Sequence, residues 1–74
     1  MIQTKNKLRY MEIYSDIKER IASENYGAGS LLPTEGELTQ LYSASRTTIR
    51  RAIALLQEDG LVKSVQGKGT EVIS

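Results

Sequence analysis

The sequence of 74 residues contains neither cysteine nor histidine. The absence of cysteine excludes disulfides and thiolate metal sites, and the absence of histidine removes the commonest general base and metal ligand. A chain of this length buries only about 60% of its unfolded surface, which leaves no room for a deep substrate cavity beside a core. We therefore expect no metal, no cofactor and no enzymatic activity.

The sequence also has no long apolar run and no secretory signal pattern, which favours a cytoplasmic protein without a membrane contact. Its net charge is only +1, but the charged residues are unevenly distributed. Residues 1–42 carry five basic and six acidic side chains, whereas residues 43–70 carry five basic and two acidic ones. Positive potential is therefore concentrated in the second half of the chain, a distribution that favours a nucleic-acid partner.

The most informative pattern lies at residues 45–58, where Ser45 is a good N-cap and Gly60 follows as a helix terminator. Apolar residues recur there at three- and four-residue spacing, with basic and hydroxyl side chains on or beside the opposite face. The apolar residues are Ile49, Ala52, Ile53 and Leu56, and the polar ones are Arg46, Thr47, Arg50 and Arg51. Such a helix suits the major groove of DNA, because arginine can bond guanine through two hydrogen bonds. The alternative is a solvated surface helix whose arginines only keep the protein soluble.

Upstream of this stretch, residues 1–9 are polar and aperiodic, and we expect a flexible tail followed by one domain over residues 10–74. From about Leu8 to Glu24 the apolar residues have helical spacing, which predicts a first helix with its two tyrosines in the core. We expect Asn25 or Gly27 to end this helix by adopting a positive φ angle.

The second helix is predicted from about Thr34 to Tyr42. Pro33 precedes it, Thr34 is its cap, and Glu37 completes a capping box three residues later. Leu38 and Leu41 are expected to point inward. Because only a short turn separates this helix from the next, the two predict a helix-turn-helix.

After Gly60 the period of the pattern changes from about 3.6 to 2. Residues 61–66 and 70–73 are predicted as strands joined by a turn at residues 67–69, and a basic hairpin tip after a helix-turn-helix is typical of a wing. An ordinary turn with a solubilising Lys68 is the alternative. The predicted fold is therefore mainly α with a small β-hairpin, a winged helix-turn-helix of three helices and a two-stranded wing.

Four blocks of the sequence together resemble the DNA-binding domain of GntR-family bacterial transcriptional regulators. The resemblance extends from about Tyr10 to Val72, and the wing is most similar to that of the HutC-like branch. The blocks are Leu32-Pro33-Thr34-Glu35, Ser45-Arg46-Thr47-Thr48-Ile49-Arg50, Leu55 to Val62, and Gln66-Gly67-Lys68-Gly69-Thr70.

The resemblance implies sequence-specific binding of double-stranded DNA, with a recognition helix at about residues 45–58 in the major groove and a wing at residues 66–70 on the minor groove or phosphates. It also implies a palindromic operator, a homodimer in the full-length protein or on DNA, and a small-molecule effector bound by a further domain outside this sequence. The DNA-binding residues that it implies are Thr34, Glu35, Ser45, Arg46, Thr47, Thr48, Arg50, Gln66, Gly67, Lys68 and Gly69.

Two positions depart from the family pattern. Gly36 stands where the family often has arginine, and Glu71 replaces the usual phenylalanine of the last strand, so affinity and specificity are expected to differ from the family norm. The alternative function is a winged helix that acts as a protein–protein interaction module. Basic residues at Arg46, Arg50 and Lys68 favour DNA, because the centre of a protein interface is mostly apolar.

Overall fold

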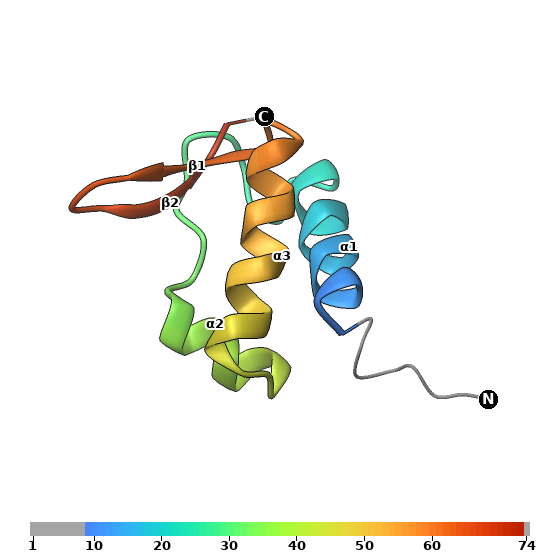
Figure 1. Ribbon diagram of the computed structural model, residues 1–74. Coiled ribbons are helices and arrows are strands. Elements are labelled where there is room, and N and C mark those ends of the chain that lie inside the picture. Colours follow the sequence, from blue (N-terminus) through green and yellow to red (C-terminus); the bar gives the residue numbers. More distant parts are fainter. Residues whose placement is uncertain (1–8, 74) are drawn as a thin grey trace.

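The computed structural model describes residues 9–73, which form three helices and a two-stranded antiparallel hairpin (Figure 1). In chain order the elements are α1 (Arg9–Ala22), α2 (Glu35–Tyr42), α3 (Arg46–Glu58), β1 (Val62–Val65) and β2 (Gly69–Val72). Helix α3 packs against both α1 and α2, and the hairpin extends sideways from its C-terminal end. This arrangement confirms the predicted winged helix-turn-helix. Of the tail expected at residues 1–9, residues 1–8 lie outside the described residues, and Arg9 is the first residue of α1 instead.

Helix α1 presents Ile13, Ile17 and Ile21 to the core at four-residue spacing, as predicted. Its end differs from the prediction, because Glu24 rather than Asn25 or Gly27 takes the positive φ angle, at 68°. The N–H of Asn25 bonds to the carbonyl of Arg20 at 2.8 Å, and the N–H of Glu24 bonds to that of Ile21 at 3.1 Å. These two bonds form a Schellman motif, so the last carbonyls of α1 are satisfied without a glycine.

Helix α2 begins with the predicted capping box. The hydroxyl of Thr34 accepts from the N–H of Glu37 at 3.1 Å, and the Glu37 carboxylate accepts from the N–H of Thr34 at 2.8 Å. Leu38 is buried, but the prediction for Leu41 is wrong, since this residue is 60% exposed. Tyr42, four residues after Leu38, packs against the core instead. The side chains of α2 that pack in or against the core are therefore Leu38 and Tyr42, which are one helical turn apart.

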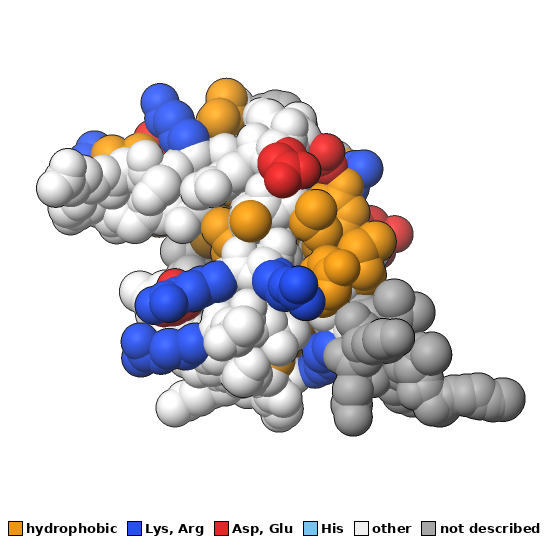
Figure 2. Space-filling model, viewed as in Figure 1, with side chains coloured by type: hydrophobic (Ala, Val, Ile, Leu, Met, Phe, Trp, Pro, Cys, Tyr) orange, Lys and Arg blue, Asp and Glu red, His pale blue; other side chains and the backbone are white. Residues whose placement is uncertain are grey.

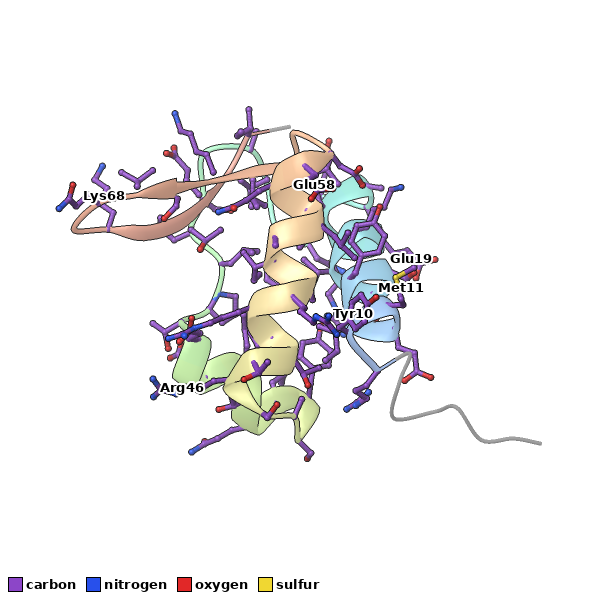
Figure 3. All side chains as sticks on the ribbon, viewed as in Figure 1. Tyr10, Met11, Glu19, Arg46, Glu58 and Lys68 are labelled. Carbon is purple, nitrogen blue, oxygen red and sulfur yellow. The ribbon has the colours of Figure 1, made fainter. Side chains whose placement is uncertain are left out.

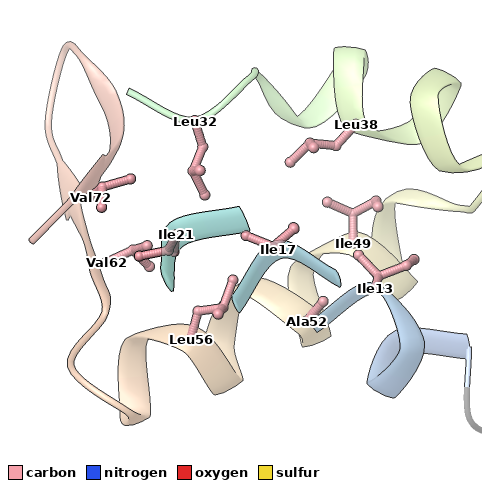
Figure 4. Close-up of a cluster of buried hydrophobic side chains, with 10 residues drawn as sticks. All are labelled: Ile13, Ile17, Ile21, Leu32, Leu38, Ile49, Ala52, Leu56, Val62 and Val72. Atoms are coloured by element: carbon pink, nitrogen blue, oxygen red, sulfur yellow. The ribbon is translucent and has the colours of Figure 1, made fainter. Parts of the chain in front are cut away.

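Helix α3 is the central element, and both of its ends match the prediction. Ser45 is its N-cap, and Gly60 adopts a φ angle of 75° just after its end. The N–H of Leu61 bonds to the carbonyl of Leu56 at 3.0 Å, which turns the chain from the helix into the hairpin. Ten side chains from all elements form one core (Figure 4). They are Ile13, Ile17, Ile21, Leu32, Leu38, Ile49, Ala52, Leu56, Val62 and Val72.

The hairpin is anchored at its base by the segment that precedes α2. Leu31 forms an antiparallel bridge with Glu71, and the N–H of Leu32 bonds to the carbonyl of Thr70 at 2.8 Å. The N–H of Val72 bonds in return to the carbonyl of Ser30 at 2.8 Å. Residues 30–32, which were expected to be extended, therefore run beside β2 as a short third extended segment. Strand β1 is shorter than predicted, whereas β2 has the predicted length but begins and ends one residue earlier, so Ile73 lies beyond its end.

Within residues 9–73, none of the three helices combines the length and the apolar character that crossing a bilayer requires.

Candidate functional site

The exposed side of α3 and the tip of the wing face the same direction. Arg46 and Arg50 are one helical turn apart, and their side chains are 67% and 66% exposed. Figure 3 shows Arg46 and Lys68 projecting toward the same side of the molecule, Arg46 beside α2 and Lys68 at the wing tip. In the space-filling view, basic side chains project below the wing, on the left (Figure 2). Long-range potential at this face is therefore positive.

A recess of about 460 Å³ lies between α3 and the wing. Its rim comes from three elements: the start of α2 with Thr34 and Glu35, the middle of α3 with Arg50, and the wing with Lys68 and Gly69. Part of its lining is apolar and belongs to the chain before α2 and to the helices, namely Leu31, Leu32, Pro33, Leu38, Ile53 and Ala54. Five predicted site residues, distant in sequence, therefore border one concave surface.

Glu35 contacts two of the three arginines of α3, Arg46 and Arg50. Its Oε2 accepts from Nε of Arg50 at 2.7 Å and its Oε1 accepts from Nη2 of Arg50 at 3.2 Å, while Nη1 of Arg46 is 3.7 Å away. The hydrogen bond from Arg50 lowers the pKa of Glu35, and the same bond raises the pKa of Arg50. At neutral pH the three side chains therefore form a charged cluster with an excess of one positive charge.

The hydroxyl groups predicted at the site have different surroundings. The Ser45 hydroxyl accepts from the N–H of Thr48 at 3.2 Å and lies 3.0 Å from the Thr48 hydroxyl. Thr34 is likewise engaged by the capping box of α2. Thr47 is exposed next to Arg46. Thr34 therefore also begins α2, and Ser45 with Thr48 stabilises the first turn of α3, structural roles that exist without any ligand.

The wing tip consists of Gln66, Gly67, Lys68 and Gly69, all of which are exposed. Gly67 has a φ angle of 83° and Gly69 one of 124°, conformations that favour glycine. The N–H of Lys68 bonds to the carbonyl of Val65 at 3.0 Å and closes the turn. The tip is therefore a narrow projection without bulky side chains, apart from one glutamine and one lysine.

The recess is also lined by Gln57, Ser64 and Thr70, which the sequence reasoning did not assign to the site. Gln57 lies seven residues after Arg50 and so on the same face of α3. Ser64 and Thr70 are cross-strand partners, and both face the recess. The periods of the helix and of the strands could have identified all three residues.

Arg51, by contrast, lies away from Arg46 and Arg50. Its guanidinium lies over the ring of Tyr10 on α1, 4.9 Å from the ring centre. Such cation–π contacts stabilise an exposed pair by about 0.5–1 kcal/mol. Arg51 therefore braces α3 against α1 rather than facing the recess.

Three packed helices, a tight turn between α2 and α3, and a basic face shared by α3 and a hairpin define a winged helix-turn-helix domain of the DNA-binding type. The chain belongs to the gntR family of bacterial regulatory proteins, whose family model matches residues 9–72.

Two relatives place this domain in longer proteins. The chain is 36% identical over 66 residues to the HTH-type transcriptional regulator TreR of Bacillus subtilis, a match that covers 89% of this chain and 28% of TreR. It is 39% identical over 67 residues to the mannosyl-D-glycerate transport/metabolism system repressor MngR of Escherichia coli, covering 90% of this chain and 28% of MngR. The chain thus spans less than a third of the length of these relatives.

The crystal structure of AraR(DBD) in complex with operator ORE1 has the same fold, with a TM-score of 0.84. The two chains are 38% identical, and the match covers 97% of this chain and 82% of the other. The family and the fold are therefore established, while membership of the HutC-like branch stays a prediction.

Proposed function

We propose that the chain is the operator-binding domain of a transcriptional regulator. In this proposal residues 45–58 enter the major groove, and wing residues 66–70 reach the adjacent minor groove or its phosphates. The recess that Arg50 and Lys68 border carries the proposal. It lies between the two groove-reading elements, where the sugar–phosphate strand that separates a major groove from its neighbouring minor groove has to pass.

Each side chain of the face has a role that its chemistry supports. Arg46 and Arg50 present guanidinium groups, which bond the O6 and N7 atoms of guanine, and Thr47 suits a phosphate or a thymine methyl. Lys68 at the narrow tip suits a phosphate or a minor-groove edge. Polar groups that line the recess can donate to the strand held there, and these are Gln57, Ser64 and Thr70.

The assembly on DNA is part of the same proposal. A two-fold homodimer would place two copies of α3 about one helical turn apart on a palindromic operator. The two relatives described above are more than three times as long as this chain, and MngR is a repressor by name. We propose that a further domain in the full-length protein dimerises and binds a small-molecule effector, and that the regulator acts in the cytoplasm, where bacterial DNA lies.

Binding to randomised duplexes tests the proposal, because the operator sequence is not known. Repeated selection should enrich one motif, and fluorescence anisotropy should then give a log–log salt slope of about −5 to −9 for a dimer that neutralises three to five phosphates per monomer. The same measurement on Lys68→Ala tests the role of the wing tip. Lys63→Ala is its matched control, because it removes the same charge from the same hairpin outside the recess. No enrichment together with a flat salt response would exclude DNA as the principal partner.

A further inference from the structure

A carboxylate at the centre of a DNA-binding face requires an explanation, because phosphates repel it. Glu35 is 36% exposed and lies at the rim of the recess, between two arginines whose charge DNA would attract. Its ion pair with Arg50 is bidentate, with distances of 2.7 Å and 3.2 Å. This contact links the first residue of α2 to the middle of α3, fifteen positions later in the chain.

We propose that Glu35 is a positioning residue that orients Arg50 for one base and reduces binding to all other DNA. The proposal rests on the proposed function. It assigns part of the sequence specificity to Glu35, a residue whose negative charge is repelled by DNA.

The orientation follows from which donors of Arg50 are occupied. A guanidinium has five N–H donors in a planar fork, and Glu35 takes one from Nε and one from Nη2. The edge formed by Nη1 and Nη2 keeps a parallel pair of donors, the geometry that matches O6 and N7 of guanine. The Arg50 side chain is still 66% exposed, so this edge is accessible to a base.

The backbone of α2 holds Glu35 in place. Thr34 and Glu37 form the capping box, which fixes the first turn of the helix around Glu35. A carboxylate is also favourable in this turn because of the helix dipole. Glu37 lies in the same turn, but its carboxylate bonds to the N–H of Thr34 and makes no contact with Arg46 or Arg50 in the described chain. It is therefore a natural control.

The reduction of general binding follows from charge. Arg46 and Arg50 alone would present two positive charges to any duplex, and Glu35 leaves an excess of one. Removing the charge of Glu35 should therefore strengthen binding to unrelated DNA and steepen its salt dependence by about one unit per monomer. It should also free Arg50 to adopt other orientations, which weakens the preference for the correct base.

The test compares wild type, Glu35→Gln, Glu35→Asp and the control Glu37→Gln on a selected duplex and on a scrambled one, over a range of salt concentrations. For Glu35→Gln we expect tighter binding to the scrambled duplex and a ratio of selected to scrambled affinity that falls by at least about fivefold. Glu35→Asp keeps the charge but shortens the side chain, so it should lose the preference without gaining general affinity. Glu37→Gln should keep the ratio.

The tighter binding of Glu35→Gln to the scrambled duplex is the readout that a purely structural brace would not give, and an NMR titration of the Glu35 carboxyl in wild type and Arg50→Ala tests the ion pair itself. The pKa of Glu35 should rise toward its usual value when Arg50 is removed. The inference is overturned if Glu35→Gln keeps the full ratio, or if it weakens binding to both duplexes equally, as a lost brace would. A wild-type chain that does not discriminate at all overturns the proposed function instead, and Glu35→Asp decides the matter if Glu35→Gln fails to fold.

Discussion

The Tyr42 hydroxyl donates a hydrogen bond to Oδ2 of Asp16 over 2.6 Å and so joins the end of α2 to α1. The same carboxylate accepts from Nε of Arg20 at 3.0 Å. The bond from Tyr42, ahead of that from Arg20, lowers the pKa of Asp16, while burial raises the pKa of Tyr42. Arg9 adds a hydrogen bond to the carbonyl of Tyr42. The turn between α2 and α3 is therefore held from the side of α1.

Tyr42→Phe should lower the free energy of unfolding by about 1 kcal/mol, because a half-buried carboxylate loses a partner. The contribution depends on pH in a defined direction. Since the folded pKa of Asp16 lies below the unfolded value, the stabilisation is complete above about pH 5 and disappears as the pH falls through the folded pKa. Urea unfolding of wild type and Tyr42→Phe at neutral and acid pH should show the difference shrink toward low pH. A difference that stays constant would mean that Asp16 is not the partner that matters.

The two leucines of α2 should respond very differently to truncation. Leu38 is 2% exposed and lies in the core, so Leu38→Ala should lower the free energy of unfolding by about 2–5 kcal/mol. Leu41→Ala should change it by less than about 1 kcal/mol, because the side chain is 60% exposed. Thermal unfolding followed by circular dichroism measures both. Equal losses would show that α2 is rotated relative to the arrangement described above.

Gly36→Ala should stabilise the domain by about 0.4–1 kcal/mol. Gly36 lies in the first turn of α2 without a positive φ angle, and a Cβ there would meet no atom within 4 Å. Alanine at such a position restricts the unfolded chain without straining the folded one. Chemical denaturation gives the size of the effect, and a loss of stability would contradict the geometry of this turn. Gly60→Ala is the matched opposite, because its φ angle of 75° makes alanine strained.

The arginines and the wing lysine should affect binding in different ways. Arg50→Ala should weaken binding to the selected duplex by about 1–3 kcal/mol and relax discrimination at one base pair, because it removes the proposed base contact. Lys68→Ala should weaken selected and scrambled duplexes alike and reduce the salt slope by about one unit per monomer. Arg51→Ala is the control on the same helix, since its guanidinium lies over Tyr10. The recognition-helix assignment is wrong if folded Arg46→Ala and Arg50→Ala both keep full discrimination.

The isolated domain should be a monomer in solution and pair only on DNA. Among residues 9–73 the large exposed apolar side chains are Met11, Leu31, Leu41 and Ile73. Leu31 and Leu41 border one open hollow, while Met11 lies on α1 and Ile73 follows β2. A stable dimer needs a larger continuous apolar surface. Analytical ultracentrifugation at micromolar concentration decides this, and a tight free dimer would contradict it.

Local chemistry made much of the fold predictable. The caps at Thr34 and Ser45 and the glycine after α3 were correct because each satisfies backbone groups within a few residues of itself. Whether Leu41 or Tyr42 points toward the core was not predictable from the sequence. Both lie within one turn of Leu38, and only packing against the other helices decides the rotation of α2 about its axis. Glu24 was missed for a related reason, since two backbone bonds compensate for a conformation that its side chain disfavours.

The candidate site, like the fold, was predictable from the sequence only in part. Resemblance and helical spacing placed Arg46 and Arg50 on an exposed face, and that face is observed. The pairing of Glu35 with Arg50 could not be read from spacing, because it joins two helices whose relative position depends on the whole core. The recess itself depends on how far the wing leans over α3, a tertiary relationship that no local pattern encodes.

The bonds between residues 30–32 and β2 tie the wing to the chain that enters α2, so the wing does not swing as an independent arm. The separation between Lys68 and Arg50 is therefore a built-in length. If both residues contact DNA as proposed, a duplex must offer a groove spacing close to that length, and a duplex with another spacing must bend or lose one of the two contacts. In the proposed complex, base pairs that the protein does not touch would thus contribute to its affinity through their stiffness.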